Sequence, residues 1–405
     1  MVPLKDIKVL ELADEIAGPH CGMQLSDGGA DVIKVEPLTG DLSRHRGVKI
    51  NGESALFLSL NRGKRSIALS QAEPGGREIV LRLAKDADVI LENYGPGRAD
   101  ELGFGYSDIA KSNPRVVYCS ISPFGEKGPY RDYPASELEI QGMAGYQWFL
   151  GEAGEPPVRL GPDLAGVDTG IWSFIGIMAA LLSRNKSGVG QKIESSMFMN
   201  MLAMIVYIIT AHYNPDQPGG FHFTGPFDHA ETGYRTKDRA ILFGMPLVPG
   251  KTEPAWESFC KQVGLAELLE DPYFKEKGMR MVGIGRDAQE FKPVIEPAME
   301  NWTSDEIRKI VEGLGGYFAM FKTYQDVFNE PQVKEVRMIE EIDHPVAKKI
   351  KVMGIPWKLK ATPAQIKGPP PLLGQHTAEI LREIGYSREE ITAFRKSKII
   401  NEEID

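Results

Sequence analysis

The sequence predicts an α/β fold built on a parallel sheet, followed by a second, smaller α+β domain. Short apolar runs alternate with amphipathic stretches over the first half of the chain, which is the pattern of βαβ units. At 405 residues the chain is too long for one average domain. A Pro- and Gly-rich stretch at 213–220 reads as a linker, and the alternation ends there.

The first half supplies the elements expected for the sheet. A strand is expected at Ile7–Leu12, a break at Ala17-Gly18-Pro19 and a helix at His20–Ser26. The other expected strands are Ala30–Val35, Arg65–Leu69, Asp88–Leu91 and Val116–Ser120, with a helix at Gly76–Lys85. The most apolar run, Met197–Ala211, is too short to span a bilayer and is expected to form a buried helix.

In the second half of the chain the sequence pattern changes twice, first after the linker and again after residue 333. A strand pair at Tyr234–Asp238 and Ala240–Gly244 and helices at Trp256–Gly264 and Asp287–Met299 predict a small α+β domain. After residue 333 the chain turns to short strands and Pro-rich connectors, and it ends in an amphipathic helix near Thr377–Ile384. We therefore expect domain limits at 1–212, 213–220, 221–330 and 331–405, the last segment returning to the large domain.

Composition narrows the function classes. The net charge of −9 argues against nucleic acid and anionic membranes as partners. Cys21, Cys119 and Cys260 lie far apart without metal-ligand spacing, so idle thiols in a reducing cytosol are expected, and no metal site is predicted. The N-terminus has no apolar signal core, which favours a cytoplasmic protein.

A series of short motifs spans nearly the whole chain in a fixed order. They are Ala17-Gly18-Pro19, Val32–Glu36 with Gly40-Asp41, Asn61–Ile67, Asp88–Gly97, Leu102-Gly103, Asn113–Arg115, Phe124-Gly125 with Gly128–Tyr130, Gly188–Gln191 and Leu373–Thr377. In this order the motifs resemble those of the class III (formyl-CoA transferase-like) CoA-transferases. The resemblance implies a Rossmann-like large domain built from both ends of the chain, an inserted small domain and an interlocked dimer.

The same resemblance implies a site for coenzyme A, bound as a thioester substrate and not as a permanent cofactor. The positions it assigns to CoA binding are Leu69, Asn93, Tyr94, Gly95, Leu102 and Ser136. Pro37 and Ala72 stand where relatives often carry basic side chains against the CoA phosphates, and Lys64, Arg65 and Arg98 are the candidates to compensate. His376 belongs to a family turn and is expected to be structural.

The nucleophile of the family is missing. The segment that precedes Ile171–Leu182 resembles the catalytic segment, in which an aspartate stands four residues before a glycine, here Gly170. That aspartate attacks the thioester in the family's covalent mechanism, and its place here is Gly166. Asp163 and Asp168 flank the position and are the fall-back nucleophiles. Otherwise Asp168 is expected to cap a helix that begins near Thr169.

The chain is therefore predicted to be the non-catalytic subunit of a CoA-transferase, with a homologous sister subunit carrying the aspartate in a heterodimer or heterotetramer. This division is similar to that of the succinyl-CoA:(R)-benzylsuccinate CoA-transferases of anaerobic toluene degradation, which implies succinyl-CoA as donor and (R)-benzylsuccinate as acceptor. The alternatives are a self-sufficient homodimer using Asp168 or Asp163, a non-enzymatic CoA-binding protein, and an isomerase that moves CoA within one molecule. Racemase relatives use a histidine–aspartate pair where Ser136-Glu137 stands here, so racemase activity is not expected.

Overall fold

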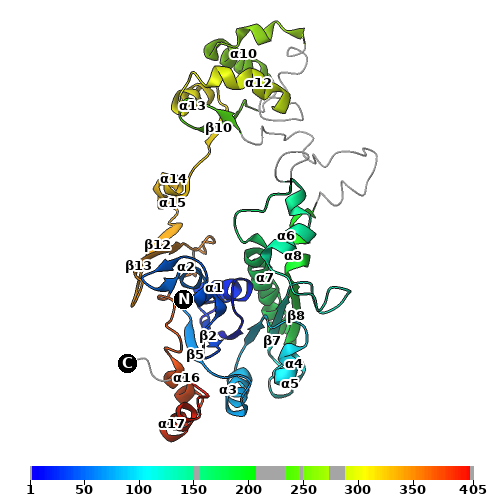
Figure 1. The fold of residues 1–405 in the computed structure, drawn as a ribbon, viewed down its shortest axis with the longest axis vertical. Coiled ribbons are helices and arrows are strands. Elements are labelled where there is room, and N and C mark those ends of the chain that lie inside the picture. The colour runs from blue at the N-terminus through cyan, green and yellow to red at the C-terminus, as the bar shows by residue number, and fades with distance from the viewer. Residues whose placement is uncertain (1, 150–155, 207–232, 247–249, 273–287, 402–405) are drawn as a thin grey trace. The chain divides into compact units, whose positions relative to one another are not determined.

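The computed structural model describes residues 2–149, 156–206, 233–246, 250–272 and 288–401 (Figure 1). One compact unit consists of residues 1–205 together with 334–405, and the other of residues 206–333. The first unit is thus built from both ends of the chain. The linker expected at 213–220 lies outside the described residues, so the expected domain limits remain predictions.

A six-stranded parallel sheet forms the centre of the first unit, in the order β5-β2-β1-β6-β7-β8. Its strands are β1 (Lys8–Leu12), β2 (Asp31–Glu36), β5 (Arg65–Ala68), β6 (Val89–Glu92), β7 (Val117–Ser122) and β8 (Gln191–Ser196). In the register, Val9 lies opposite Val32 on one side and Val89 on the other. The predicted α/β fold with a parallel sheet is confirmed.

Helices and two short hairpins complete this unit. Its helices are α1 (Ala17–Asp27), α2 (Ala55–Leu60), α3 (Pro74–Lys85), α4 (Arg98–Leu102), α5 (Tyr106–Ser112), α6 (Glu137–Met143), α7 (Leu164–Ser187), α8 (Met197–Met204), α16 (Thr377–Glu383) and α17 (Arg388–Lys396). Two 3-10 turns are η1 (Leu42–His45) and η2 (Tyr146–Phe149). The antiparallel hairpins are β3 (Lys49–Ile50) with β4 (Glu53–Ser54), and β12 (Ile339–His344) with β13 (Lys348–Met353).

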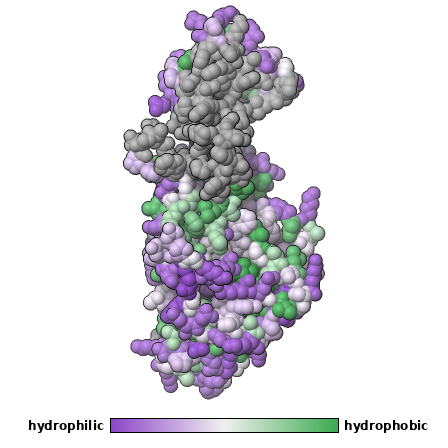
Figure 2. Space-filling view, turned by 90° about the vertical axis from the view of Figure 1, so that its right-hand side faces the viewer, coloured by the Kyte–Doolittle hydropathy of each residue, from purple (hydrophilic) through white to green (hydrophobic). Residues whose placement is uncertain are grey.

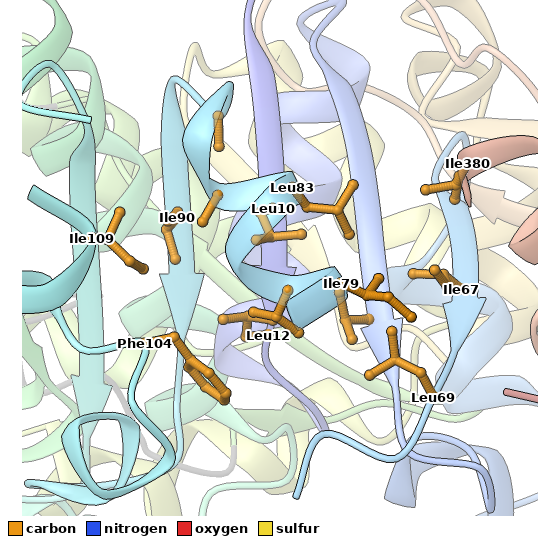
Figure 3. Close-up of a cluster of buried hydrophobic side chains, with 14 of the residues drawn as sticks. Leu10, Leu12, Ile67, Leu69, Ile79, Leu83, Ile90, Phe104, Ile109 and Ile380 are labelled. Carbon is orange, nitrogen blue, oxygen red and sulfur yellow. The ribbon is translucent and has the colours of Figure 1, made fainter. Parts of the chain in front are cut away.

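The main core lies between the sheet and helix α3. Ile79 and Leu83 of α3 pack over the apolar strand residues, among them Leu10 and Ile90 (Figure 3). Ile380 of α16 joins the same cluster, so the C-terminal segment stabilises the sheet formed by the N-terminal one. Burial of apolar area of this kind is the dominant favourable term in folding.

Two local expectations were wrong. Helix α1 begins at Ala17, so Gly18 and Pro19 lie in its first turn and do not break the chain. Proline is tolerated in the first turn because the N–H it lacks would have no partner inside the helix. The chain also ends in a further helix, α17, whose capping box joins Ser387 to Glu390.

Helix α7 is long and apolar enough, by length and composition, to cross a membrane. Half of its most apolar window is buried inside the unit, where Ile177 and Leu181 pack with strand residues of the sheet. This packing is that of a core helix. The run Met197–Ala211, expected to be the buried helix, contributes the shorter α8, and its residues after 206 lie outside the described part.

The second unit contains a three-stranded antiparallel sheet in the order β11-β10-β9. Its elements are β9 (Tyr234–Arg235), β10 (Ala240–Gly244), α10 (Thr252–Val263), η3 (Ala266–Leu269), α12 (Ala288–Met299), α13 (Ser304–Gly313), β11 (Tyr317–Met320) and α14 (Tyr324–Asn329), and α15 (Pro331–Glu335) leads back to the first unit. The predicted strand pair and both predicted helices are present. In its core Trp256 stacks on Phe259, and Phe243 packs against Phe259 in a tilted arrangement.

Candidate functional site

A cavity of about 610 Å³ opens at the carboxyl ends of β1, β2, β5 and β6. From β1 the chain builds outward through β2 and β5 on one side, and then through β6 to β8 on the other. The strand order reverses between β1 and β6, which is where open α/β sheets bind ligands. The lining residues are Leu12, Ala13, Asp14, Lys34, Val35, Glu36, Pro37, Leu38, Thr39, Asp41, Leu69, Ser70, Gln71, Ala72, Asn93, Tyr94, Arg98 and Leu102.

The residues expected to contact CoA divide into two groups. Leu69, Asn93, Tyr94 and Leu102 line the cavity, whereas Gly95 and Ser136 do not. Ser136 instead precedes α6, in a capping box with Glu139. The side chain of Asn93 is held in place by Asp14, since its amide oxygen accepts from Asp14 N and its amide nitrogen donates to Asp14 O, both at 3.0 Å.

Most of the cavity wall is apolar, and a group of buried ion pairs lies beneath it. Lys34 is fully buried, with Nζ 2.9 Å from Glu11 Oε1 and 2.7 Å from Asp41 Oδ2. Burial alone would lower the pKa of Lys34, but the charges of Glu11, Asp41 and Glu36 raise it above its ordinary value. Lys34 therefore keeps its charge and ties together the ends of β1 and β2.

Three basic residues were expected to contact the CoA phosphates in place of the basic side chains missing at positions 37 and 72. Only one of the three lines the cavity. Arg98 lines the cavity, as do Pro37 and Ala72. Lys64 is buried against Glu11 at 2.8 Å, and burial lowers its pKa to about 8. Arg65 forms ion pairs with acidic residues including Asp31 at 2.6 Å and, on α16, Glu383 at 2.8 Å. Lys64 and Arg65 thus form ion pairs outside the cavity lining, and a role for either at the phosphates stays a prediction.

Gly166 is the third residue of α7, and a carboxylate stands beside it. Glu137 Oε1 accepts from Ala165 N at 2.6 Å, and Glu137 Oε2 accepts from Gly166 N at 2.9 Å. A Cβ built on Gly166 would lie 2.8 Å from Ile16 Cγ2 and 3.6 Å from Glu137 Oε2. The start of α7 is thus capped by Glu137, and Ile16 fills the space next to the place of the missing aspartate.

Neither flanking aspartate replaces the missing side chain. Asp163 is half exposed and pairs with Arg159 at 2.9 Å. Asp168 lies two residues beyond Gly166, which turns its side chain by about 200° around the helix, away from that position. The expected capping role of Asp168 was also wrong, because α7 begins at Leu164 and Asp168 is inside it.

Asp168 has an unusual environment. It is 4% exposed, and within the described part of the chain its Oδ2 has no hydrogen-bond partner. Burial raises its pKa to about 6, although a hydrogen bond from Trp172 acts in the opposite direction. The charge of Asp168 also acts on Tyr146, which packs beside the apolar cluster of α6, α7 and α8.

Two further expectations concern structural residues. His376 Nδ1 accepts from Ser66 N at 3.1 Å, and burial lowers its pKa, so it fastens the C-terminal turn to β5 as a structural residue. Among the methionines of α8, Met201 is buried and Met199 and Met204 are exposed.

Sequence reasoning gave Glu137 no specific role, leaving it as structural or pocket-lining. The capping box of Ser136 and Glu139 predicts the start of α6, but nothing local indicates that Glu137 reaches the start of another helix. Over the residues that the structure describes, no group of three His, Cys, Asp or Glu side chains is placed to hold a metal ion.

A parallel α/β sheet with a cavity at the reversal of its strand order places the first unit in the class of doubly wound α/β proteins, which bind their ligands at that point. Within that class, the chain belongs to the CoA-transferase family III, whose family model matches residues 4–377. This finding confirms the resemblance drawn from the motifs. CoA thioesters are the substrates of that family.

Two CoA-transferases and one solved structure are similar to this chain over most of their length. Succinyl-CoA:glutarate CoA-transferase of Mus musculus is 33% identical, covering 95% of this chain and 87% of the mouse protein. Formyl-CoA:oxalate CoA-transferase of Escherichia coli is 30% identical, and the match covers 98% of this chain and 99% of the E. coli protein. The crystal structure of a CAIB/BAIF family protein from Brucella suis is 30% identical with a TM-score of 0.83, covering 95% of this chain and 99% of that one.

Proposed function

We propose that this chain is a subunit of a cytoplasmic CoA-transferase that transfers CoA from succinyl-CoA to a carboxylic acid, with (R)-benzylsuccinate as the first acceptor to test. The chain lacks the nucleophile, and a homologous sister subunit with an intact aspartate carries the covalent step. The observation that carries the proposal is Gly166 at the start of α7. It is supported by the positions of Asp163 and Asp168, neither of which reaches that place.

The outer face of α7 supports the pairing with a second chain. Ile171, Trp172, Ile175 and Leu182 are exposed and fall on one side of the helix by their spacing. Neighbouring helices add exposed apolar side chains, namely Leu138 and Met143 of α6 and Met199 and Met204 of α8. Figure 2 faces the side of the molecule on which α6 and α8 lie in Figure 1, and it shows apolar side chains gathered on part of that face among hydrophilic ones. Exposed apolar patches of this kind mark interaction sites. We propose that the sister subunit covers the apolar patch of α6, α7 and α8 in an interlocked assembly.

The first test compares the purified chain with the chain co-expressed with its nearest paralogue. Succinyl-CoA is the donor, benzylsuccinate is the acceptor, and hydroxylamine traps an enzyme-bound anhydride or thioester. We expect turnover and trapping only in the mixture, with the trapped group on the paralogue. Turnover by this chain alone would refute the pairing, and CoA binding without turnover in any mixture would indicate a non-enzymatic CoA-binding protein.

A second candidate function is a self-sufficient CoA-transferase, favoured by the place of Glu137. The Glu137 Oε2 atom lies 3.6 Å from the ideal Cβ position of Gly166, so its carboxylate stands beside the place of the missing aspartate. Its carboxylate also accepts from Gln141 Nε2 at 2.8 Å, which fixes its orientation. In this reading Glu137, and neither Asp168 nor Asp163, would attack the thioester.

Replacing Glu137 with glutamine separates the two functions. Under the primary proposal the assembly keeps its transfer activity, and the chain loses about 1 kcal/mol of unfolding free energy because a charged cap becomes neutral. Urea denaturation and the trapping assay measure the two effects. Glu139→Gln is the matched control, since Glu139 is exposed and caps only α6. Loss of both turnover and trapping in Glu137→Gln alone would identify Glu137 as the nucleophile.

A further inference from the structure

The first turn of α7 lies very close to the start of α1 at Gly166. Gly166 is buried, and a Cβ built on it would lie 2.8 Å from Ile16 Cγ2 and 3.0 Å from Ile16 Cβ. The next nearest atom, Glu137 Oε2, would be 3.6 Å away, which is an ordinary van der Waals distance. A side chain at position 166 is therefore obstructed by Ile16 and not by Glu137.

Ile16 is held in place by the residues around it. Its backbone oxygen accepts from His20 N at 2.8 Å, which ties it to the first turn of α1. The residue before it, Glu15, has a φ of 62°, a left-handed conformation that is uncommon outside glycine. Glu15 N donates to Oδ1 of the buried Asp41 at 3.2 Å. A side chain added at position 166 would therefore overpack against a fixed neighbour, which destabilises the folded chain.

We propose that Ile16 is a second position that disables this chain, because it closes the space into which a side chain of residue 166 would project. The inference rests on the proposed function, which makes residue 166 the place of the missing nucleophile. It adds that the two residues depend on each other. Glycine is required at position 166 while residue 16 is isoleucine, and a carboxylate side chain fits there only when residue 16 is small.

A double-mutant cycle of urea denaturation curves tests the mutual dependence. Alanine is ordinarily more stable than glycine in a helix, but we expect Gly166→Ala to raise the unfolding equilibrium constant by about tenfold or more, because its Cβ meets Ile16. In the Ile16→Gly background, where the N-cap of α1 tolerates glycine, the same change should raise it by less than about twofold. Equal effects in both backgrounds would overturn the inference.

Gly142→Ala is the control for this cycle. Gly142 is an exposed glycine of α6, and its added Cβ would meet only the end of the Gln147 side chain, at 3.4 Å. We expect no increase of the unfolding equilibrium constant in this variant, with either residue at position 16.

Hydroxylamine trapping with succinyl-CoA tests the chemical consequence in the double variant Ile16→Gly/Gly166→Asp. A carboxylate oxygen of the introduced side chain bonds to the thioester carbonyl carbon, the C–S bond breaks, and the sulfur leaves as CoA thiolate. The hydroxylamine nitrogen then attacks the enzyme's carbonyl carbon in the resulting anhydride and expels succinate. A hydroxamate remains on the protein, where mass spectrometry locates it.

We expect the hydroxamate yield of the double variant to exceed that of Gly166→Asp alone and of Ile16→Gly alone by about tenfold or more. An equal yield in Gly166→Asp alone would show that Ile16 does not block the position, and a folded double variant without trapping would show that more than these two residues disables the chain. Either result would overturn the inference. Trapping in the unmodified chain would contradict the proposed function instead, and the denaturation cycle tests the inference in either case.

Discussion

Replacing Lys34 with methionine is expected to lower the free energy of unfolding by about 3–5 kcal/mol. The change leaves Asp41 buried without its cation, whereas Glu11 keeps its ion pair with Lys64. The methionine fills similar volume, so the loss comes from uncompensated charge and not from a void. Urea denaturation at neutral pH measures it. Lys111→Met is the control, because its pair with Asp108 is exposed and its loss is expected to change stability by less than about 0.5 kcal/mol.

The pH dependence of this difference has a defined sign. Burial raises the pKa of Asp41, but Lys34 and the hydrogen bonds from Lys34 and Ser43 outweigh it and lower the pKa to about 2. Its contribution to stability is present above the ordinary value of 3.8 and is lost as the pH falls through about 2. In the variant Asp41 protonates at higher pH, which relieves the buried charge. The difference between the two proteins should therefore be smaller near pH 4 than near pH 7, and an equal difference at both would contradict this account.

The fold could be predicted from the sequence because its signals are local. Apolar runs such as Ile7–Leu12 and Asp88–Leu91 stand out from the more polar residues around them, and they became the central strands β1 and β6. Strand β8 has no such run, since its sequence QKIESS is largely polar at the edge of the sheet, and it was not predicted. The signal for α17 was present as a capping box at Ser387 and Glu390.

Residues of the candidate site could be predicted only where their positions follow from their distance to a recognised motif along the chain. Gly166 could be placed in this way at the start of α7, and four of the six residues assigned to CoA binding line the cavity. The roles of Lys64, Arg65 and Arg98 could not be predicted, because the sequence shows only that all three are basic, and the fold is needed to show which of them faces the cavity. The start of α7 was misplaced because its cap comes from Glu137, far away in the sequence.

Replacing Asp168 with asparagine is expected to stabilise the purified chain by about 1–3 kcal/mol above pH 7. In the folded chain burial raises the pKa of Asp168 from its ordinary value of 3.8 to about 6. A raised carboxyl pKa means that the folded state holds the proton more tightly, so this group disfavours folding increasingly as the pH rises from about 4 through about 6. Asparagine has nearly the same shape and carries no charge, so it removes that penalty.

The gain in Asp168→Asn should disappear near pH 4, where the native carboxyl is already protonated. Thermal or urea denaturation at several pH values measures the dependence, and Asp163→Asn is the control because Asp163 is half exposed and paired with Arg159. The same variant tests the fall-back nucleophile. If Asp168 carried the covalent step, its replacement would abolish CoA transfer and hydroxylamine trapping. A stabilised chain that still supports transfer in the mixture with its sister would instead show that this buried carboxylate is a structural cost of the fold and takes no part in the reaction.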